Sequence, residues 1–226
     1  MVDIAAQQQD WRAAIAFSRG LPGVERIVLW GTSYSGGHVL ALAAELDGLA
    51  GVIAQAPMAD GRAAARGVEP RQLLRLAAHG LIDEARGRLG FAPHTIAITG
   101  EPGELALLTT PDAAAGLAVL NPDGYPWPNE VGARFALRAG SYRPARHAEH
   151  IACPVVVCDD DAITSPAPAA DAAHRAPRGE LLRLTGGHYA VYEGAGFDHA
   201  VTAQIAFVER CGAQPPVGAG ARRERA

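Results

Sequence analysis

A serine lies in the glycine-rich heptapeptide Gly-Thr-Ser-Tyr-Ser-Gly-Gly, residues 31–37, between two segments of different periodicity. The apolar run before it, residues 27–30, predicts a buried strand, and the stretch after it, residues 39–46, predicts a helix. A tight turn brings the end of the strand close to the first turn of the helix, so its neighbours must be small. The pattern therefore predicts a strained strand–turn–helix unit that lifts Ser33 above a sheet, beside a helix N-terminus that stabilises negative charge.

Two serines compete for the centre of this turn. With Ser33 at the centre the motif is G-x-S-Y-x-G, in which Ser35 replaces the usual second glycine and Gly36 follows one residue later. With Ser35 at the centre, the leading glycine is missing. We favour Ser33, because Gly31 then ends the strand and the backbone N–H of Tyr34 is placed for an oxyanion hole. Taken alone, the motif is equally a glycine-rich turn that only packs or that cradles a phosphate.

An acidic loop and a histidine loop follow in chain order. The apolar run of residues 154–158 predicts a strand, and three consecutive aspartates, residues 159–161, come directly after it. Residues 181–184 predict a further strand, which is followed by Gly186, Gly187 and His188. An acid after a buried strand can orient a histidine, and a histidine after glycines can reach a nucleophile as general base. The order serine, acid, histidine predicts a catalytic triad and differs from the orders in chymotrypsin and subtilisin.

All three segments resemble the α/β-hydrolase superfamily. The G-x-S-Y-x-G motif is similar to the nucleophile elbow of X-prolyl dipeptidyl peptidase and cocaine-esterase-like members. Residues 161–166 resemble the acid loop, in which an aspartate precedes a proline by a few residues, and residues 186–188 resemble the histidine loop. The resemblance covers residues 1 to about 211, with its middle part the weakest.

The resemblance implies an α/β fold, in which helices flank a hydrolase sheet, and it implies a role for each site residue. The catalytic residues would be Ser33, Asp161 and His188, and the N–H of Tyr34 would bind the oxyanion. The two preceding aspartates, residues 159 and 160, would then cap a helix or remain solvated in the turn.

The segment before the predicted nucleophile strand is short for this superfamily. Its first 25 or so residues predict one amphipathic helix, with Ile4, Trp11 and Ile15 on one face. Members of the superfamily carry several strands before the nucleophile strand, and a loop among those strands supplies a second oxyanion N–H. We therefore expect an N-terminally incomplete sheet with an open edge. Such an edge favours aggregation or pairing with a second copy, so a homo-oligomer is one expected outcome.

We expect four segments along the chain. Residues 1–60 form the first part of the core with the elbow, residues 61–150 a mainly helical, cap-like insertion, residues 151–211 the second part of the core, and residues 212–226 a disordered tail. The core also includes a buried strand within residues 49–57 and a final amphipathic helix over residues 197–211.

The insertion carries one clear helical pattern, over residues 71–89, and several turn signals. The candidates for the apolar side of that helix are Leu73, Leu74, Leu76, Leu81 and Ile82. Four further apolar side chains line a pocket or pack in a core, namely Phe91, Leu107, Tyr125 and Trp127. The sequence assigns no residue to substrate binding.

Composition excludes several function classes. The 226 residues are 49% hydrophobic, which predicts a globular chain with a substantial core. The net charge of −4 without a basic stripe argues against a nucleic-acid partner. The chain has neither an apolar run of membrane length nor a basic signal-peptide start, so we expect a cytoplasmic protein without membrane contact. All 20 basic residues are arginines, which excludes lysine Schiff bases, P-loop lysines and serine–lysine dyads.

We expect the histidines and cysteines outside the predicted triad to have structural rather than catalytic roles. His147, Glu149 and His150 have a spacing that could bring metal ligands together, but a solvated helix end explains them better. His38 lies on the helix behind Ser33, where we expect packing or hydrogen bonding rather than catalysis. The three cysteines, residues 153, 158 and 211, lie beside apolar runs and are expected to be buried thiols.

The sequence thus predicts a serine hydrolase that acts on an ester or small amide through an acyl-enzyme, with neither metal nor organic cofactor. The alternative is a non-catalytic or truncated relative, either a binding module or a gene fragment. A small nucleotide-binding domain fits poorly, because the glycines do not form a G-x-G-x-x-G pattern.

Overall fold

The computed structural model describes residues 2–121, 125–159 and 166–213. The chain divides into two compact units, which we call the core unit (Ala5–Asp60 with Arg143–Ala226) and the insertion unit (Met1–Ile4 with Gly61–Tyr142). Among the helices of the described part, none combines the length and apolar content that a bilayer span requires.

The core unit contains a parallel sheet of four strands in the order β1-β2-β6-β7. The strands are β1 (Val28–Thr32), β2 (Gly51–Gln55), β6 (Val155–Asp159) and β7 (Gly179–Arg183). Strands β1, β2 and β6 fall on apolar runs that the sequence identified, because strands covered on both faces are largely apolar. The edge strand β7 overlaps the predicted run of residues 181–184 but also contains Glu180 and Arg183. In the register, Val28 pairs with Gly51, and Val155 pairs with Val52 and Gly179. All four carboxyl ends therefore lie along one edge of the sheet.

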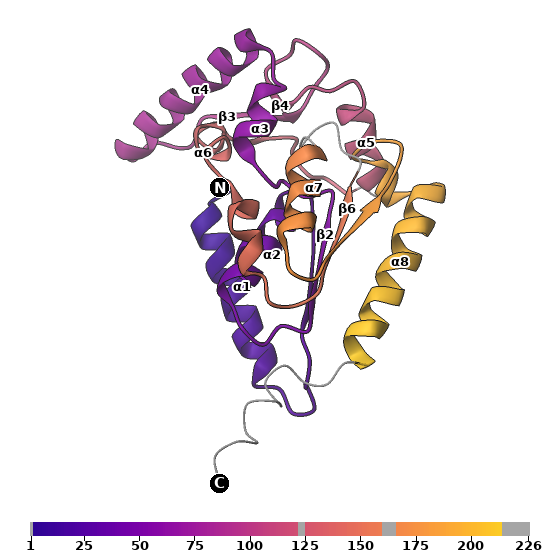
Figure 1. Cartoon of the computed structure of the whole chain (residues 1–226). Helices are drawn as coiled ribbons and strands as arrows, with labels where there is room; N and C mark the ends of the chain where they lie inside the picture. The colour runs from indigo at the N-terminus through magenta and orange to yellow at the C-terminus, as the bar shows by residue number, and fades with distance from the viewer. Residues whose placement is uncertain (1, 122–124, 160–165, 214–226) are drawn as a thin grey trace. The chain divides into compact units, whose positions relative to one another are not determined.

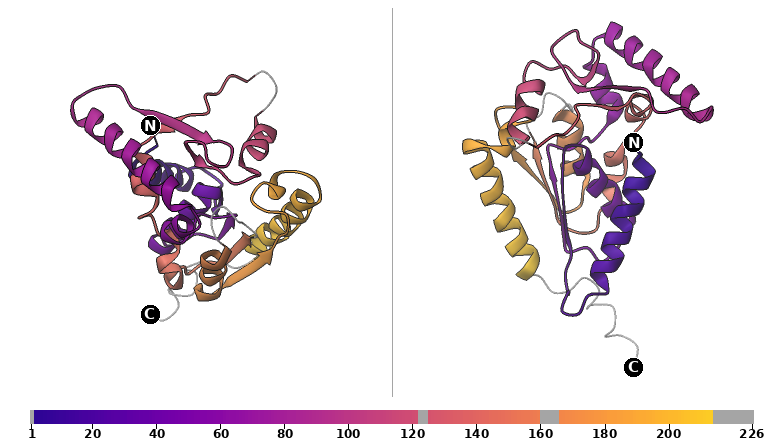
Figure 2. Two further views of the ribbon diagram at one scale, coloured as in Figure 1. Left: turned by 90° about the horizontal axis from the view of Figure 1, so that it is seen from above. Right: turned by 180° about the vertical axis from the view of Figure 1, so that it is seen from behind.

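Helices cover both faces of this sheet (Figure 1). One face packs against α1 (Ile4–Arg19), α2 (Ser33–Glu45), the 3-10 helix η1 (Pro144–His150) and α7 (Pro166–Arg175). The other face packs against η2 (Ala190–Tyr192) and α8 (Gly194–Ala213). Figure 2 shows α1 and α8 on opposite sides of the strands. The predicted first and last helices are confirmed, with Ile15 of α1 and Phe207 of α8 buried.

Strand β1 forms one edge of the described sheet. Among the described residues it pairs only with β2. Trp30 in this strand keeps 46% of its side chain exposed, although its neighbour Leu29 is buried.

The inserted stretch of the insertion unit is Gly61–Tyr142, which ends before the predicted boundary at residue 150, and beside its helices it contains a small sheet that the sequence did not indicate. Its helices are α3 (Gly61–Arg66), α4 (Pro70–Arg88), α5 (Ala113–Leu120) and α6 (Phe135–Ala139). Its strands are β3 (Thr95–Thr99), β4 (Ala106–Leu108) and β5 (Val131–Gly132), in the order β4-β3-β5. Strands of two to five residues among prolines and glycines are too short for a periodic signal.

The two ends of the inserted segment lie together. Within the insertion unit, the backbone N–H of Gly61 donates to the carbonyl oxygen of Tyr142 at 2.7 Å. Within the core unit, the adjacent residues Asp60 and Arg143 form an ion pair at 2.7 Å. The chain therefore leaves and re-enters the core at one place.

The predicted apolar side of α4 is wrong. Only one of the five candidates, Leu76, is buried, and the other four are exposed. The buried side instead carries two polar residues, because each finds partners from other segments. Gln72 donates to two backbone carbonyl oxygens, and Asp83 accepts three hydrogen bonds from the side chain and backbone of Arg134 and one from the N–H of His94. These bonds hold the pKa of the Asp83 carboxyl well below its usual range, mainly through the Arg134 guanidinium.

Candidate active site

Ser33 has a strained backbone at the junction of β1 and α2. Its φ is 52°, and among the described non-glycine residues only Ala56 shares a positive φ. This left-handed region is unfavourable for an L-residue with a side chain and persists only where the surrounding structure enforces it. The half-buried serine follows the last residue of β1 and is the first residue of α2. The side chain therefore lies at the carboxyl edge of the sheet, next to a helix N-terminus.

Glycines on both sides of Ser33 allow the close approach that this turn needs. A Cβ atom at Gly31 would collide with the carbonyl oxygen of Ser35. A Cβ atom at Gly36 would lie 3.0 Å from the Cα of Pro57, which is tighter than ordinary van der Waals contact. The close packing is thus required at Gly36, whereas the preceding position accommodates Ser35. This explains locally why the motif is G-x-S-Y-x-G.

The segment after β2 packs directly under the turn. The N–H of Met58 donates to the carbonyl oxygen of Ser33 at 2.9 Å. This hydrogen bond helps to hold the strained backbone of Ser33 in place. A Cβ atom at Gly37 would collide with the carbonyl oxygen of Met58. A glycine is therefore also required at position 37, because Met58 packs against it.

His188 lies in a loop at the same edge of the sheet. It follows β7, is 4% exposed, and comes after Gly186 and Gly187, whose φ values are 107° and 85°. Both glycines adopt a backbone conformation that L-residues with side chains avoid. The His188 ring makes edge contacts with the rings of Tyr189 and Tyr192, with centroid distances of 5.1 and 6.3 Å.

A side-chain hydrogen bond joins the serine segment to the histidine segment. The Oγ1 of Thr32, the residue before Ser33, lies 2.6 Å from the hydroxyl oxygen of Tyr192. These two residues are 160 positions apart in the sequence. The fold thereby brings the predicted nucleophile segment and the predicted base segment together. Sequence reasoning missed both Thr32 and Tyr192.

The predicted acid, Asp161, lies outside the described residues, as does Asp160. Asp159 is the last residue of β6, so its backbone ends a core strand at the same carboxyl edge.

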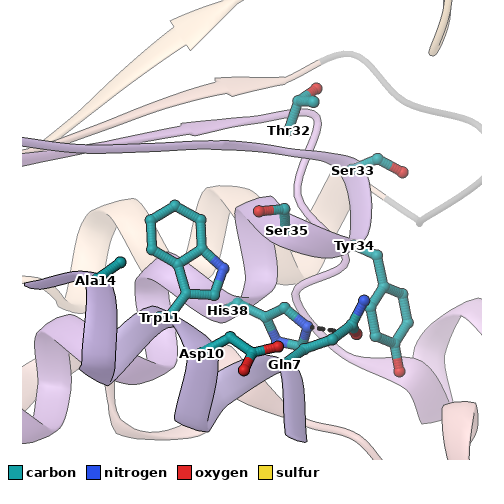
Figure 3. A pocket seen from close by; sticks show the side chains of 9 residues that line it. All are labelled: Gln7, Asp10, Trp11, Ala14, Thr32, Ser33, Tyr34, Ser35 and His38. Carbon is teal, nitrogen blue, oxygen red and sulfur yellow. Dashed lines mark hydrogen bonds between the residues drawn. The ribbon is translucent and has the colours of Figure 1, made fainter. Parts of the chain in front are cut away.

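A pocket of about 620 Å³ lies between α1 and the serine turn (Figure 3). Its lining comes from the first helix and the elbow and comprises Gln7, Asp10, Trp11, Ala14, Thr32, Ser33, Tyr34, Ser35 and His38. Figure 3 shows that the Ser35 hydroxyl points toward Trp11 and that the Ser33 hydroxyl points away from Trp11. The two serines thus present their hydroxyls to different surroundings.

His38 is a buried, neutral histidine on α2. It is 2% exposed, and its Nε2 lies 3.2 Å from Oε1 of Gln7. Because an amide oxygen only accepts, Nε2 carries the proton in this bond. Burial lowers the pKa of His38 from its usual 6.5 to about 4. The ring also meets the edge of the Tyr34 ring, at a centroid distance of 5.4 Å. These contacts agree with the predicted hydrogen-bonding role.

The donor atoms of His147, Glu149 and His150 do come together in η1, within 4.8 Å of one another. All three residues are exposed, and Glu149 forms an ion pair with Arg175 of α7. The two imidazole rings stack with an interplanar angle of 8° and a centroid distance of 5.6 Å. Stacked parallel rings direct their in-plane lone pairs side by side rather than at one ion. The solvated helix end stays a prediction, since three ligand atoms are near one another and exposed acidic groups are common without a metal ion.

The remaining candidates divide between a second pocket, a core and the surface. Tyr125 and Trp127 line a pocket of about 350 Å³ within the insertion unit, together with residues of α5. Leu107 packs against the core of that unit, and Phe91 is exposed.

Cys153 and Cys211 are buried free thiols, as expected, and burial raises the pKa of Cys153 to about 11.

Comparisons with known proteins give one relative in sequence and several in structure. No family model matches the chain. Over 214 residues the chain is 38% identical to the quorum-quenching protein AidA of Acinetobacter baumannii (strain MDR-ZJ06), covering 93% of this chain and 70% of that protein. The α/β hydrolase GrgF from Penicillium sp. sh18 superposes with a TM-score of 0.71 at 20% identity, over 92% of this chain and 72% of that one. A monoacylglycerol lipase of Paleococcus ferrophilus gives 0.61 at 17% identity, over 93% and 75%.

Proposed function

The chain belongs to the α/β-hydrolase superfamily, and on that premise we propose that it is a serine hydrolase that cleaves an ester or small amide bond. The observation that carries this proposal is the backbone of Ser33, with a φ of 52° between β1 and α2. Strain of this kind is retained where a side chain must be held in one fixed position, as at a nucleophile elbow. The glycine contacts around it supply the second support.

In the proposed reaction the Ser33 hydroxyl attacks the acyl carbon while His188 removes its proton. The backbone N–H of Tyr34 donates to the oxyanion, which lies at the N-terminus of α2. His188 then gives the proton to the leaving alcohol or amine, and an acyl-enzyme remains on Ser33. Water attacks this acyl group with His188 as base, releasing the acid and restoring the serine. Asp161 would orient the imidazole and stabilise its protonated form.

The name of the sequence relative supports one substrate class for testing. AidA is described by its name as a quorum-quenching protein, so diffusible bacterial signal molecules with a lactone, ester or amide bond belong among the substrates to test. The proposed steps need no metal or organic cofactor.

A fluorophosphonate probe tests the nucleophile directly. Intact mass followed by peptide mapping should find one adduct, on Ser33, and His188→Ala should prevent it. With an activated ester, Ser33→Ala should reduce turnover to the background rate, whereas Ser35→Ala should keep much of it. The reverse pattern would transfer the nucleophile to Ser35. Soluble, folded protein without any adduct would instead support the non-catalytic alternative.

A further inference from the structure

A chain of polar side chains crosses the α8 side of the core sheet and ends beside Ser33. The indole N–H of Trp30 donates to Oε1 of Gln204 at 3.0 Å, and Nε2 of Gln204 donates to Oε1 of Gln55 at 2.6 Å. Nε2 of Gln55 donates to Oγ1 of Thr32 at 3.3 Å, and Thr32 meets the Tyr192 hydroxyl at 2.6 Å. These hydrogen bonds form a network that joins β1, α8, β2 and η2.

The direction of these hydrogen bonds is set from one end. An indole nitrogen only donates, so the Gln204 oxygen must face Trp30 and its NH2 group must face Gln55. Gln55 in turn has its oxygen occupied and directs its own NH2 group to Thr32. Both amide orientations are therefore determined by the network, and the Thr32 hydroxyl retains capacity to pair with Tyr192.

The position of this network within an apolar layer indicates a specific role. Gln55 and Gln204 are 3% and 8% exposed, on the same side of the sheet as Ile53, Val156 and Phe207. Apolar side chains would fill such positions without the desolvation that buried amides require. Hydrogen bonds that satisfy the two buried amides favour one arrangement of the segments that they join. Here they join the nucleophile strand to the segment that follows His188.

The loop that carries His188 needs a contact that fixes its position. Its two glycines, Gly186 and Gly187, have positive φ values and give the backbone freedom that other residues lack. Tyr192 contributes two contacts at once: its ring meets the His188 ring, and its hydroxyl meets Thr32. A displacement of about 1 Å in a catalytic group can reduce a rate by about 100-fold, so a fixed loop position has kinetic value.

We propose that Tyr192 is a positioning residue, whose hydrogen bond to Thr32 holds the His188 loop at a fixed distance from Ser33. The proposal rests on the function proposed above, with Ser33 as nucleophile and His188 as base. Tyr192 does not touch the reacting atoms in this role. It acts through the histidine that it contacts.

Tyr192→Phe removes the hydroxyl and keeps the ring. A hydrogen bond of ordinary net strength corresponds to about a 3- to 10-fold change in the population of the positioned loop. We expect kcat on an activated ester, and the rate of fluorophosphonate labelling, to fall by about that factor, with KM within about twofold of wild type. Thr32→Val should lower kcat similarly, and Thr32→Ser, which keeps a hydroxyl, should recover most of that loss. Tyr142→Phe, the same change in the insertion unit, is the matched control.

Two readouts separate this proposal from a merely structural role and from failure of the proposed function. Imidazole proton–nitrogen NMR spectra should show the His188 signal shifted or broadened in Tyr192→Phe, while the other histidine signals stay in place. Unchanged kcat and an unchanged His188 signal in a folded variant would overturn the proposal. If the wild-type chain itself fails to label at Ser33, the proposed function has failed, and the His188 signal alone decides whether Tyr192 fixes the loop.

Discussion

Acid should destabilise the core unit through one buried histidine, His38. Its side chain is 2% exposed, and burial lowers its pKa from the usual 6.5 to about 4. Between these values the unfolded chain binds a proton that the folded chain does not. The stability contributed by the neutral ring is therefore fully present above pH 6.5 and is lost as the pH falls toward 4.

The size of this effect follows from the two pKa values. Their difference corresponds to about 3 kcal/mol of unfolding free energy, at about 1.4 kcal/mol per pKa unit. His38 also lines the pocket beside α1, where water screens part of the charge of a protonated ring. We therefore expect a loss of about 2 kcal/mol between pH 7 and pH 4 from this residue.

Urea unfolding at a series of pH values, followed by circular dichroism, measures this contribution. His38→Gln carries a side chain that does not titrate and whose amide can still donate to Gln7, so its stability should fall less on acidification, by about 2 kcal/mol. His199→Gln removes an exposed histidine of α8 and should follow the wild-type curve. If His38→Gln also follows that curve, the ring is protonated in the folded chain and the reasoning is refuted.

Two further predictions concern packing and a buried ion pair. Gly37→Ala places a methyl group against the carbonyl oxygen of Met58 and should lower the unfolding free energy by about 1–3 kcal/mol in urea titrations. Gly212→Ala lies in a helix, and beyond its chain neighbours and the backbone of that helix no atom lies within 4 Å of the new methyl group. It should be neutral or slightly stabilising, and equal losses in both variants would contradict the packing argument. Asp83→Asn removes the charge that Arg134 faces in the buried pair, so amide hydrogen exchange should accelerate across the insertion unit, and an unchanged exchange pattern would disprove this role.

The core unit is predictable from sequence because its signals are local. Parallel strands covered on both faces give uninterrupted apolar runs, so residues 27–30 and 154–158 identify β1 and β6 without knowledge of their partners. The turn around Ser33 is equally local, since its strain and its glycines lie within a few positions of each other.

The features that sequence reasoning missed depend on partners far along the chain. Asp83 is buried on α4 because Arg134, 51 positions later, neutralises it, so counting leucines selects the wrong face of the helix. The Thr32–Tyr192 hydrogen bond spans 160 positions, and neither residue is unusual in its own segment. One signal was available: Gln55 ends an otherwise apolar strand, and a buried amide needs a partner.

The closed ends of the inserted segment bear on how such a protein can diversify. Because Gly61 and Tyr142 are hydrogen-bonded to each other, the stretch between them begins and ends at one place. Recombination could exchange that stretch for another of different length without changing the register of any core strand. The length of the inserted stretch is thus free to vary while the core keeps the geometry that Ser33 requires.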